Sequence, residues 1–588
     1  MQDKETNNSS TDSGKKTPAY YSVLFKSREV GSRYVKRNRT VASFRPIKLL
    51  DSLVEIASYA STRAYGWFAM TFGLLSLFLH LAEYYFSSSP SDELSQLVIG
   101  AVFALLSIPL LLADIPMCTA LQRFTVTDYI LFEFFSIKRT GEYKRRKSGR
   151  PIIGAIFGLI AAVFGFFFPM EWVVVVLISI LVATVSFVSP EFPLLLMLIL
   201  VPYTTLFSNS GEILIGISVL ALVSFFAKVM LGKRHYSIGI SDACIFVFAA
   251  TIVVFGVIGG GSDSTGISLM LVALTLGYIP AANIIVNRRL ADCAIDAIVF
   301  SSFPVCIVAI AQYIANLITS TRTPSSSVMS SPYILATYLC IVLTIVIASI
   351  GGVRGPVKRG VYIGLLPLLL FALITTECIP VLIVLVTLLI ARDIIRSRKV
   401  AKELLILLAV APSVIFLLPT SALAAISSLS PMGTTLVELR AEFIRSFRIF
   451  SDSIFIGVGA ADLSGDAPVA MLNSVLGLGH RFGIFAVIVL CVLCAIRLYQ
   501  DTLYSSLLKS SQLSVFSNMT TIAMFTLAAC GWFCDAFANL GLYCLFFALF
   551  GLNTAAMRIS RSEHQERAEY LKDQKDIDFS AVDIFLHR

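Results

Sequence analysis

Long apolar runs with almost no charge recur along most of the chain, and they restrict its fold more than any other feature. Each run spans roughly 17–22 residues, enough for one helix to cross about 30 Å of hydrocarbon. Lipid offers no hydrogen-bond partners, so the backbone groups of each run must be paired within its own helix. With 57% hydrophobic and 14% charged residues in a chain of 588, the sequence predicts an all-α polytopic membrane protein.

The positions of the basic residues predict how these runs cross the membrane, because lysine and arginine favour cytoplasmic loops. If both termini are cytoplasmic, the segments on that side hold 41 of the 46 lysines and arginines. We therefore expect both termini to be cytoplasmic. The map contains about sixteen spans, which start near residues 66, 97, 152, 172, 192, 212, 241, 267, 294, 333, 361, 379, 403, 472, 519 and 541.

The same map divides the chain into four regions. They are a basic N-terminal segment (1–65, of which 1–19 are expected to be disordered), the first transmembrane helices (66–190), a main transmembrane core (191–556) with an extracytoplasmic loop at 423–471, and a cytoplasmic tail (557–588). Apolar residues are interleaved with the basic ones in 20–64. This pattern favours a segment that lies on the membrane surface, with the binding of a partner as the alternative.

Charge and cysteine placement exclude several classes of function. The net charge of +9 does not indicate nucleic-acid binding, because the basic residues lie in short loops between apolar runs. The eleven cysteines lie mostly inside those runs and lack the spacing of a metal site. The sequence also has no Gly-x4-Gly-Lys-Ser/Thr phosphate loop. We expect no metal, no cofactor and no ATP-driven step on this chain.

The loop 423–471 holds three of the five basic residues that fall outside the cytoplasmic segments: Arg440, Arg445 and Arg448. On a helix Arg445 and Arg448 share a face, and a stripe of Phe443, Phe447 and Phe450 runs beside them. One interpretation is an interfacial helix with its apolar face on lipid. The other is a set of guanidinium groups that bind a phosphate or pyrophosphate.

The next apolar run carries His480 and Arg481 about two turns inside it, where ionisable side chains are costly unless they face a cavity or a partner. Asn473 lies on the same helical stripe as His480, which predicts a polar groove that opens outward. The alternative is a buried structural pair that a carboxylate neutralises. Glu377 and Asp535, both at outer ends of spans, are the candidate carboxylates for pairing with Arg481 or orienting His480.

The order of these residues resembles the signature of the O-antigen ligase and O-antigen polymerase superfamily. The residues that carry the resemblance are Arg440-x3-Ile444, Asp452-Ser-Ile454-Phe-Ile-Gly457-Val-Gly459 and Asn473-Ser-x-Leu476-x6-Gly483. Three positions differ from the family pattern: Leu472 replaces its histidine, Ile454 its proline and Ile444 its aromatic residue. In addition, Thr376-Glu377-Cys378 stands where the family has Ser-Arg-Gly.

The resemblance implies a GT-C-like helical bundle in the bacterial cytoplasmic membrane. It implies a polysaccharide polymerase or ligase that transfers glycan from an undecaprenyl-pyrophosphate carrier at the outer face. The partners would be the polyprenyl-pyrophosphate-linked glycan, membrane lipids and other envelope-biosynthesis proteins.

The resemblance also suggests roles for the singled-out residues. The three arginines of the loop would contact phosphates, together with Arg481. Asn473 would shape the groove, and His480 would be the base, with Glu377 as a second catalytic candidate.

Two other functions remain open. A non-catalytic relative would bind lipid-linked glycan or scaffold envelope assembly, which fits the loss of the family's histidine and arginine. A transporter has less support, because we expect neither an inverted repeat nor a pair of glycine-broken helices around a midplane site.

Overall fold

The computed structural model describes fifteen stretches of the chain. They are residues 28–30, 60–86, 93–137, 151–168, 170–206, 210–232, 234–319, 323–350, 356–378, 380–382, 384–386, 413–427, 436–463, 471–505 and 511–560. The segment predicted to be disordered (1–19) and most of the tail predicted for 557–588 lie outside them. The described residues are helical almost throughout.

The first half of the described chain contains two short strands among its helices. Its elements are β1 (Arg28–Val30), α4 (Thr62–Phe86), α5 (Glu93–Leu112), α6 (Met117–Arg123), α7 (Thr125–Thr127), the π-helix η2 (Asp128–Phe134), α8 (Pro151–Phe167), α9 (Met170–Val188), α10 (Glu191–Leu200), the 3-10 helix η3 (Val201–Tyr203), α11 (Ser210–Met230), β2 (Tyr236–Ile238), α12 (Ile240–Leu276) and α13 (Tyr278–Ile284).

The second half is helical wherever it has regular structure. Its elements are α14 (Arg288–Ile318), α15 (Pro332–Ile350), α16 (Pro356–Thr375), α19 (Val414–Leu417), α20 (Thr420–Ser427), α21 (Leu436–Ser451), the 3-10 helix η5 (Ala461–Leu463), α22 (Ser474–Ser505) and α23 (Ser511–Cys530). The last helix spans Leu540–Ser560.

Among the described residues, nine helices are long and apolar enough to cross a membrane, and five shorter apolar helices accompany them. The chain is therefore a multi-pass helical membrane protein, as the apolar runs predicted. Helices begin within a few residues of fourteen of the sixteen predicted starts. The spans predicted near residues 379 and 403 fall largely outside the described residues, so the number sixteen and the sidedness of the termini stay predictions.

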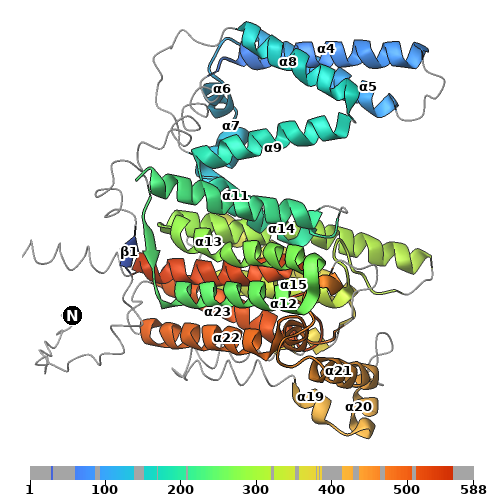
Figure 1. Cartoon of the computed structure of the whole chain (residues 1–588), viewed down its shortest axis with the longest axis vertical. Coiled ribbons are helices and arrows are strands. Elements are labelled where there is room, and N and C mark those ends of the chain that lie inside the picture. Colours follow the sequence, from blue (N-terminus) through green and yellow to red (C-terminus); the bar gives the residue numbers. More distant parts are fainter. Residues whose placement is uncertain are drawn as a thin grey trace, which may run out of the picture.

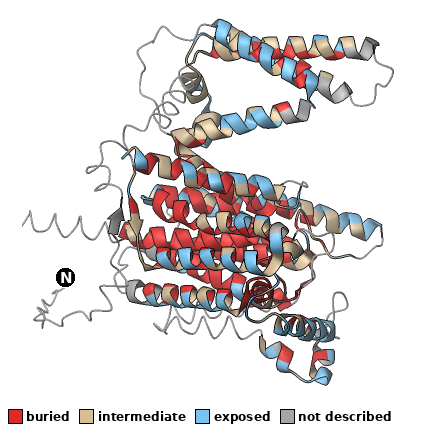
Figure 2. Cartoon of the chain, viewed as in Figure 1, coloured by how far each residue is buried: buried red, intermediate tan, exposed pale blue. Residues whose placement is uncertain are grey.

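The core lies around the helix Leu540–Ser560, which contacts Phe248 of α12 and Tyr278 of α13. In an apolar stretch of 18 residues within that helix, 94% of the residues are buried, and in the corresponding stretch of Pro332–Ile350 78% are buried. Figure 2 shows the buried residues gathered in this central layer, while the helices at the margin carry broad exposed faces. The N-terminal helices α4, α5 and α8 pack on one another at one margin (Figure 1) and have a small core of their own around Phe72 and Ala162.

Helix α12 is a hairpin of two spans that turns at Gly261. Its φ of 69° and ψ of −154° are accessible almost only to glycine. The Ser264 hydroxyl donates to the Gly256 carbonyl at 2.8 Å, so the chain has reversed direction there. The two spans predicted to start near residues 241 and 267 are therefore the two arms of this hairpin.

Helix α22 is broken at Gly483, where φ is 74° and ψ is 174°. The break could not be expected from the sequence, because residues 474–505 contain one long apolar run. The sequence interpretation considered glycine breaks only as a pair around a midplane site, and it did not predict this single break. The break lies in the N-terminal third of α22, the helix on which α21 packs.

A segment from the loop 423–471 replaces the hydrogen bonds that α22 loses at its break. Val458 N–H donates to the His480 carbonyl and Gly459 N–H to the Arg481 carbonyl, both at 2.9 Å. Ile484 N–H in turn donates to the Ile454 carbonyl at 2.7 Å. Since unpaired backbone groups are costly in a membrane protein, these bonds allow the break. We call residues 453–459 the clasp.

The opposite end of the bundle is held by Arg558, at the end of the last helix. Its guanidinium donates to the carbonyls of Ala282 and Ser237 at 3.1 and 2.9 Å, to Asn283 Oδ1 at 2.7 Å, and to Asp242 Oδ2 at 3.1 Å. It thus joins α12, α13 and β2. Strand β2 also pairs antiparallel with β1, which lies at the end of the bundle remote from α20 and α21 (Figure 1).

Candidate functional site

The predicted cationic helix exists as α21, and its three arginines differ in their surroundings. Arg440 is partly buried and donates to the Leu418 carbonyl at 3.0 Å, which ties α21 to the chain before α20. Arg445 and Arg448 are exposed. Only these two guanidinium groups are therefore open to a ligand from solution or from the membrane.

The phenylalanine stripe of α21 faces protein at two of its three positions, which corrects the prediction that it lies on lipid. Phe443 stacks on Phe416 with ring centroids 4.4 Å apart and lies 6.2 Å from Trp532. Phe450 packs against Gly479, where an added Cβ atom would lie 2.6 Å from its ring. Phe447 is exposed. Helical spacing alone could not distinguish packing on protein from packing on lipid.

His480 is buried, with 6% of its surface exposed, and its ring reaches the clasp. Its Nδ1 atom lies 3.0 Å from the hydroxyl of Ser453, a half-buried residue two positions after the end of α21. The pair can pass a proton between the surface and the buried ring, because a hydroxyl both donates and accepts. Ser453 was missed by the sequence interpretation, since nothing in its neighbours indicates a contact 27 residues away.

Arg481 pairs with Asp535, one of its two predicted partners. The Nη2–Oδ2 distance is 2.7 Å, and the side chains are 2% and 8% exposed. Gly477 makes room for this pair, because an added Cβ atom there would collide with the Asp535 carboxylate. Asp535 Oδ1 also accepts from the Ala538 N–H at 3.1 Å. This ion pair is buried and engaged on both sides, which is the arrangement of a structural contact.

Asn473 caps α22, where the sequence interpretation placed it in a substrate groove. Its Oδ1 atom accepts from the N–H groups of Val475 and Leu476 at 2.8 and 3.1 Å. Asparagine is among the best residues for this role. The next residue, Ser474, accepts from the Ala536 N–H and donates to the Cys534 carbonyl, both at 2.9 Å. The start of α22 is therefore tied to the turn that holds Asp535.

Glu377 does not join His480 and Arg481 through any contact found among the described residues. It follows α16 with a φ of 54°, and its Oε2 atom is buried without a hydrogen-bond partner in the described part of the chain. The structure thus brings together His480 with Ser453 and Arg481 with Asp535. It leaves Glu377 apart.

The described residues offer little else for chemistry at this end. They contain no group of three histidine, cysteine, aspartate or glutamate side chains that could hold a metal. Cys534 lies in the turn beside Asp535, but burial raises the pKa of its thiol to about 12. A thiol protonated at neutral pH is a poor nucleophile.

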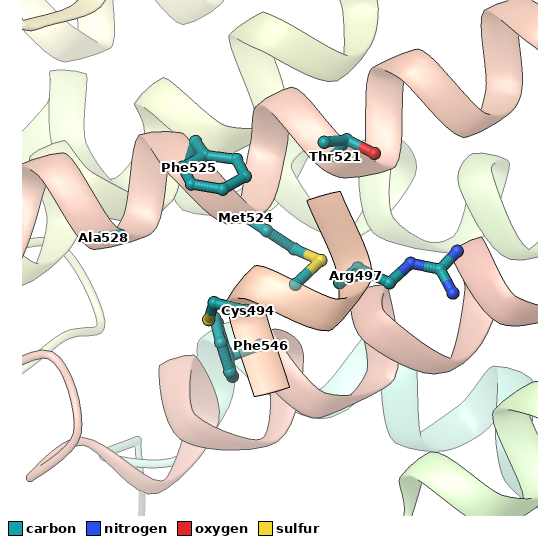
Figure 3. Close-up of a pocket in the computed structure, with 7 residues that line it drawn as sticks. All are labelled: Cys494, Arg497, Thr521, Met524, Phe525, Ala528 and Phe546. Atoms are coloured by element: carbon teal, nitrogen blue, oxygen red, sulfur yellow. The ribbon is translucent and has the colours of Figure 1, made fainter. Parts of the chain in front are cut away.

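A pocket between α22, α23 and the last helix lies elsewhere and is mostly apolar. It is lined by Cys494, Arg497, Thr521, Met524, Phe525, Ala528 and Phe546. Figure 3 shows the Arg497 guanidinium extending away from Cys494 and Phe546. That group donates to Gln500 Oε1 at 3.3 Å and to Thr554 Oγ1 at 3.1 Å. This pocket shares no residue with the His480 site.

No protein-family model matches the chain, and no curated protein matches it.

Proposed function

We propose that this multi-pass protein transfers glycan from a polyprenyl-pyrophosphate carrier at the end of the bundle that carries α21. The proposal includes a place in the bacterial cytoplasmic membrane and a role as a polysaccharide polymerase or ligase. It follows the resemblance of residues 440–483 to the O-antigen ligase and polymerase superfamily. Its structural support comes from one contact, the hydrogen bond between Ser453 Oγ and His480 Nδ1.

That contact gives the buried histidine a route to an acceptor. In the transfer, a hydroxyl oxygen of the acceptor sugar forms a bond to the anomeric carbon of the donor, and the bond from that carbon to the pyrophosphate oxygen breaks. The acceptor proton passes through the Ser453 hydroxyl to His480, which acts as general base. The pyrophosphate leaves with its electron pair on the polyprenyl carrier.

The leaving group requires positive charge close to Ser453. Arg448 lies five positions before Ser453 and is exposed at the end of α21, and Arg445 lies one turn further back. Planar guanidinium groups bind phosphate oxygens in pairs, which suits a pyrophosphate. Arg440 is assigned a positioning role, because its side chain donates to the Leu418 carbonyl.

Donor consumption by purified protein tests the proposal. Proteoliposomes would receive polyprenyl-pyrophosphate-linked glycan and acceptor glycan, with release of the polyprenyl pyrophosphate as readout. We expect His480→Gln to lower kcat by roughly 10²–10⁴-fold and Ser453→Ala to lower it less. Arg448→Gln should raise KM for the donor.

Ser451→Ala is the matched control. Its hydroxyl lies two positions from Ser453 and donates to the Arg448 carbonyl at 2.6 Å, without reaching His480. Turnover in wild type that survives unchanged in His480→Gln would overturn the assignment of the base. No turnover in wild type would overturn the transfer reaction itself.

The burial of His480 and of the Arg481–Asp535 pair favours a second function, that of a non-catalytic protein that binds lipid-linked glycan or scaffolds envelope assembly. Side chains so enclosed suit a scaffold better than a reaction centre, and a non-catalytic relative would use only Arg445 and Arg448. Such a protein would bind lipid-linked glycan with an affinity that the two arginines control, and it would release no polyprenyl pyrophosphate in the same assay.

A further inference from the structure

The surface of α21 changes character in a fixed order around its axis. With about 100° between successive residues, the side that packs on the protein holds Leu439, Phe443, Ser446 and Phe450. Next to it lies an exposed apolar sector of Val437, Ile444 and Phe447. The exposed arginines Arg448 and Arg445 follow, and the exposed acidic residues Glu438 and Glu442 complete the circle.

The exposed apolar sector is large, and the segment that follows the helix exposes apolar residues too. Ile444 is 50% exposed and Phe447 is 55% exposed. Phe455 and Ile456 of the clasp are exposed as well. Contiguous apolar surface of this kind marks a contact with a membrane or another molecule. The helix on which α21 packs, α22, exposes the apolar side chains of Phe485 and Ile488 as well.

We propose that α21 is an interfacial helix that lies in the headgroup layer of the leaflet at its end of the bundle. Ile444 and Phe447 insert among the acyl chains, Arg445 and Arg448 contact the phosphates of anionic phospholipids, and Glu438 and Glu442 face water. The order apolar, basic, acidic around the helix follows the order acyl chain, phosphate, water across that layer. A protein partner gives no reason for this order.

The inference does not depend on glycan transfer. It concerns bulk phospholipid and the depth of a helix, which can be measured in the absence of a donor. It also explains why Phe447 stays exposed while its neighbours Phe443 and Phe450 pack on protein. If the transfer reaction holds as well, a carrier lipid in the same leaflet would reach Ser453 by lateral diffusion.

Tryptophan placed around the helix tests the depth. The single variants Phe447→Trp, Ile444→Trp and Glu442→Trp would be reconstituted in vesicles of phosphatidylcholine and phosphatidylglycerol. Their fluorescence would be compared with that of wild type, which supplies the baseline of the native tryptophans. Phospholipids brominated near the headgroup end of the acyl chain should quench the residues at 447 and 444. Aqueous acrylamide should quench the residue at 442.

The headgroup contact has its own measurement. Full-length protein purified with bound lipid should carry phosphatidylglycerol in excess over its share in the vesicles, and Arg445→Gln/Arg448→Gln should lose at least half of that excess. Glu438→Gln/Glu442→Gln is the control and should keep it. Equal quenching of Phe447→Trp and Glu442→Trp by acrylamide, with none by brominated lipid, would overturn the proposal, because residue 447 would then face water. An unchanged lipid excess in the arginine variant would overturn the phosphate contact.

Discussion

Arg481 and Asp535 form a buried ion pair of 2.7 Å that joins α22 to the turn before the last helix. Two charged groups at this depth are costly on their own and stable only together. The pair therefore fixes the N-terminal part of α22, including His480, to the turn that precedes the helix Leu540–Ser560.

Removal of one member of this pair should destabilise the fold. Asp535→Asn leaves the Arg481 charge buried without its carboxylate, and we expect a loss of about 3–5 kcal/mol, measured as reduced thermal stability of the detergent-solubilised protein. Asp452→Asn, at an exposed position, should leave stability unchanged. The double variant Arg481→Gln/Asp535→Asn should be more stable than Asp535→Asn alone; additive losses would contradict the coupling.

Gly483 should tolerate no side chain. Its φ of 74° and ψ of 174° cost other residues about 1–3 kcal/mol, and an added Cβ atom would collide with the Phe455 carbonyl. Gly483→Ala should therefore abolish the monodisperse peak in size-exclusion chromatography. Gly364→Ala in α16, where no atom lies within 4 Å of the added methyl group, is the control. Normal folding of Gly483→Ala would contradict the break.

Arg558 should resist conservative replacement. A lysine keeps the charge but offers one point donor in place of a planar fork, so it cannot reach the carbonyls, the Asn283 amide oxygen and Asp242 together. Arg558→Lys should lower thermal stability, and Arg558→Gln should lower it further because Asp242 is then buried without its cation. Arg359→Lys, at an exposed position, should have no effect. Equal stability of Arg558→Lys and wild type would show that charge alone suffices.

The Cys534 thiol should react slowly and only at high pH. Burial raises its pKa from 9.0 to about 12, so the folded state holds the proton more tightly than the unfolded chain. Its contribution to stability is therefore complete below pH 9 and is lost as the pH rises towards 12. Alkylation by N-ethylmaleimide, located by mass spectrometry, should still be accelerating at pH 10. A rate that levels off near pH 9 would contradict the shift, and denatured protein is the control.

The sequence predicted the class of fold and the positions of most helices, because apolar runs and loop charges report directly on spans. It predicted Asp535 as a possible partner of Arg481 from its level in the bundle. It could not predict the break at Gly483, since glycines inside transmembrane runs more often serve helix packing. Nor could it predict the Ser453–His480 contact, which depends on how the clasp folds back on α22.

Asn473 shows a different limit. An asparagine just before a helix is typical of an N-cap. The resemblance to a family motif led instead to the prediction that Asn473 lines a substrate groove. The prediction that the phenylalanine stripe of α21 lies on lipid is wrong at two positions for a physical reason. Lipid and protein interiors attract the same side chains. Packing on lipid can be distinguished from packing on protein only by the order of apolar, basic and acidic sectors around the helix. That order becomes visible only when the side that packs on protein is known.

The clasp also has a consequence for synthesis. The residues that complete the hydrogen bonds of α22 precede that helix in the chain, and the hairpin α12 against which Gly459 and Ala460 pack comes earlier still. At typical elongation rates the roughly 24 residues from Gly459, the end of the clasp, to Gly483 take about 1–5 s to make. The clasp has therefore been synthesised before the break in α22, so hydrogen-bond donors for the carbonyls of His480 and Arg481 already exist when α22 forms.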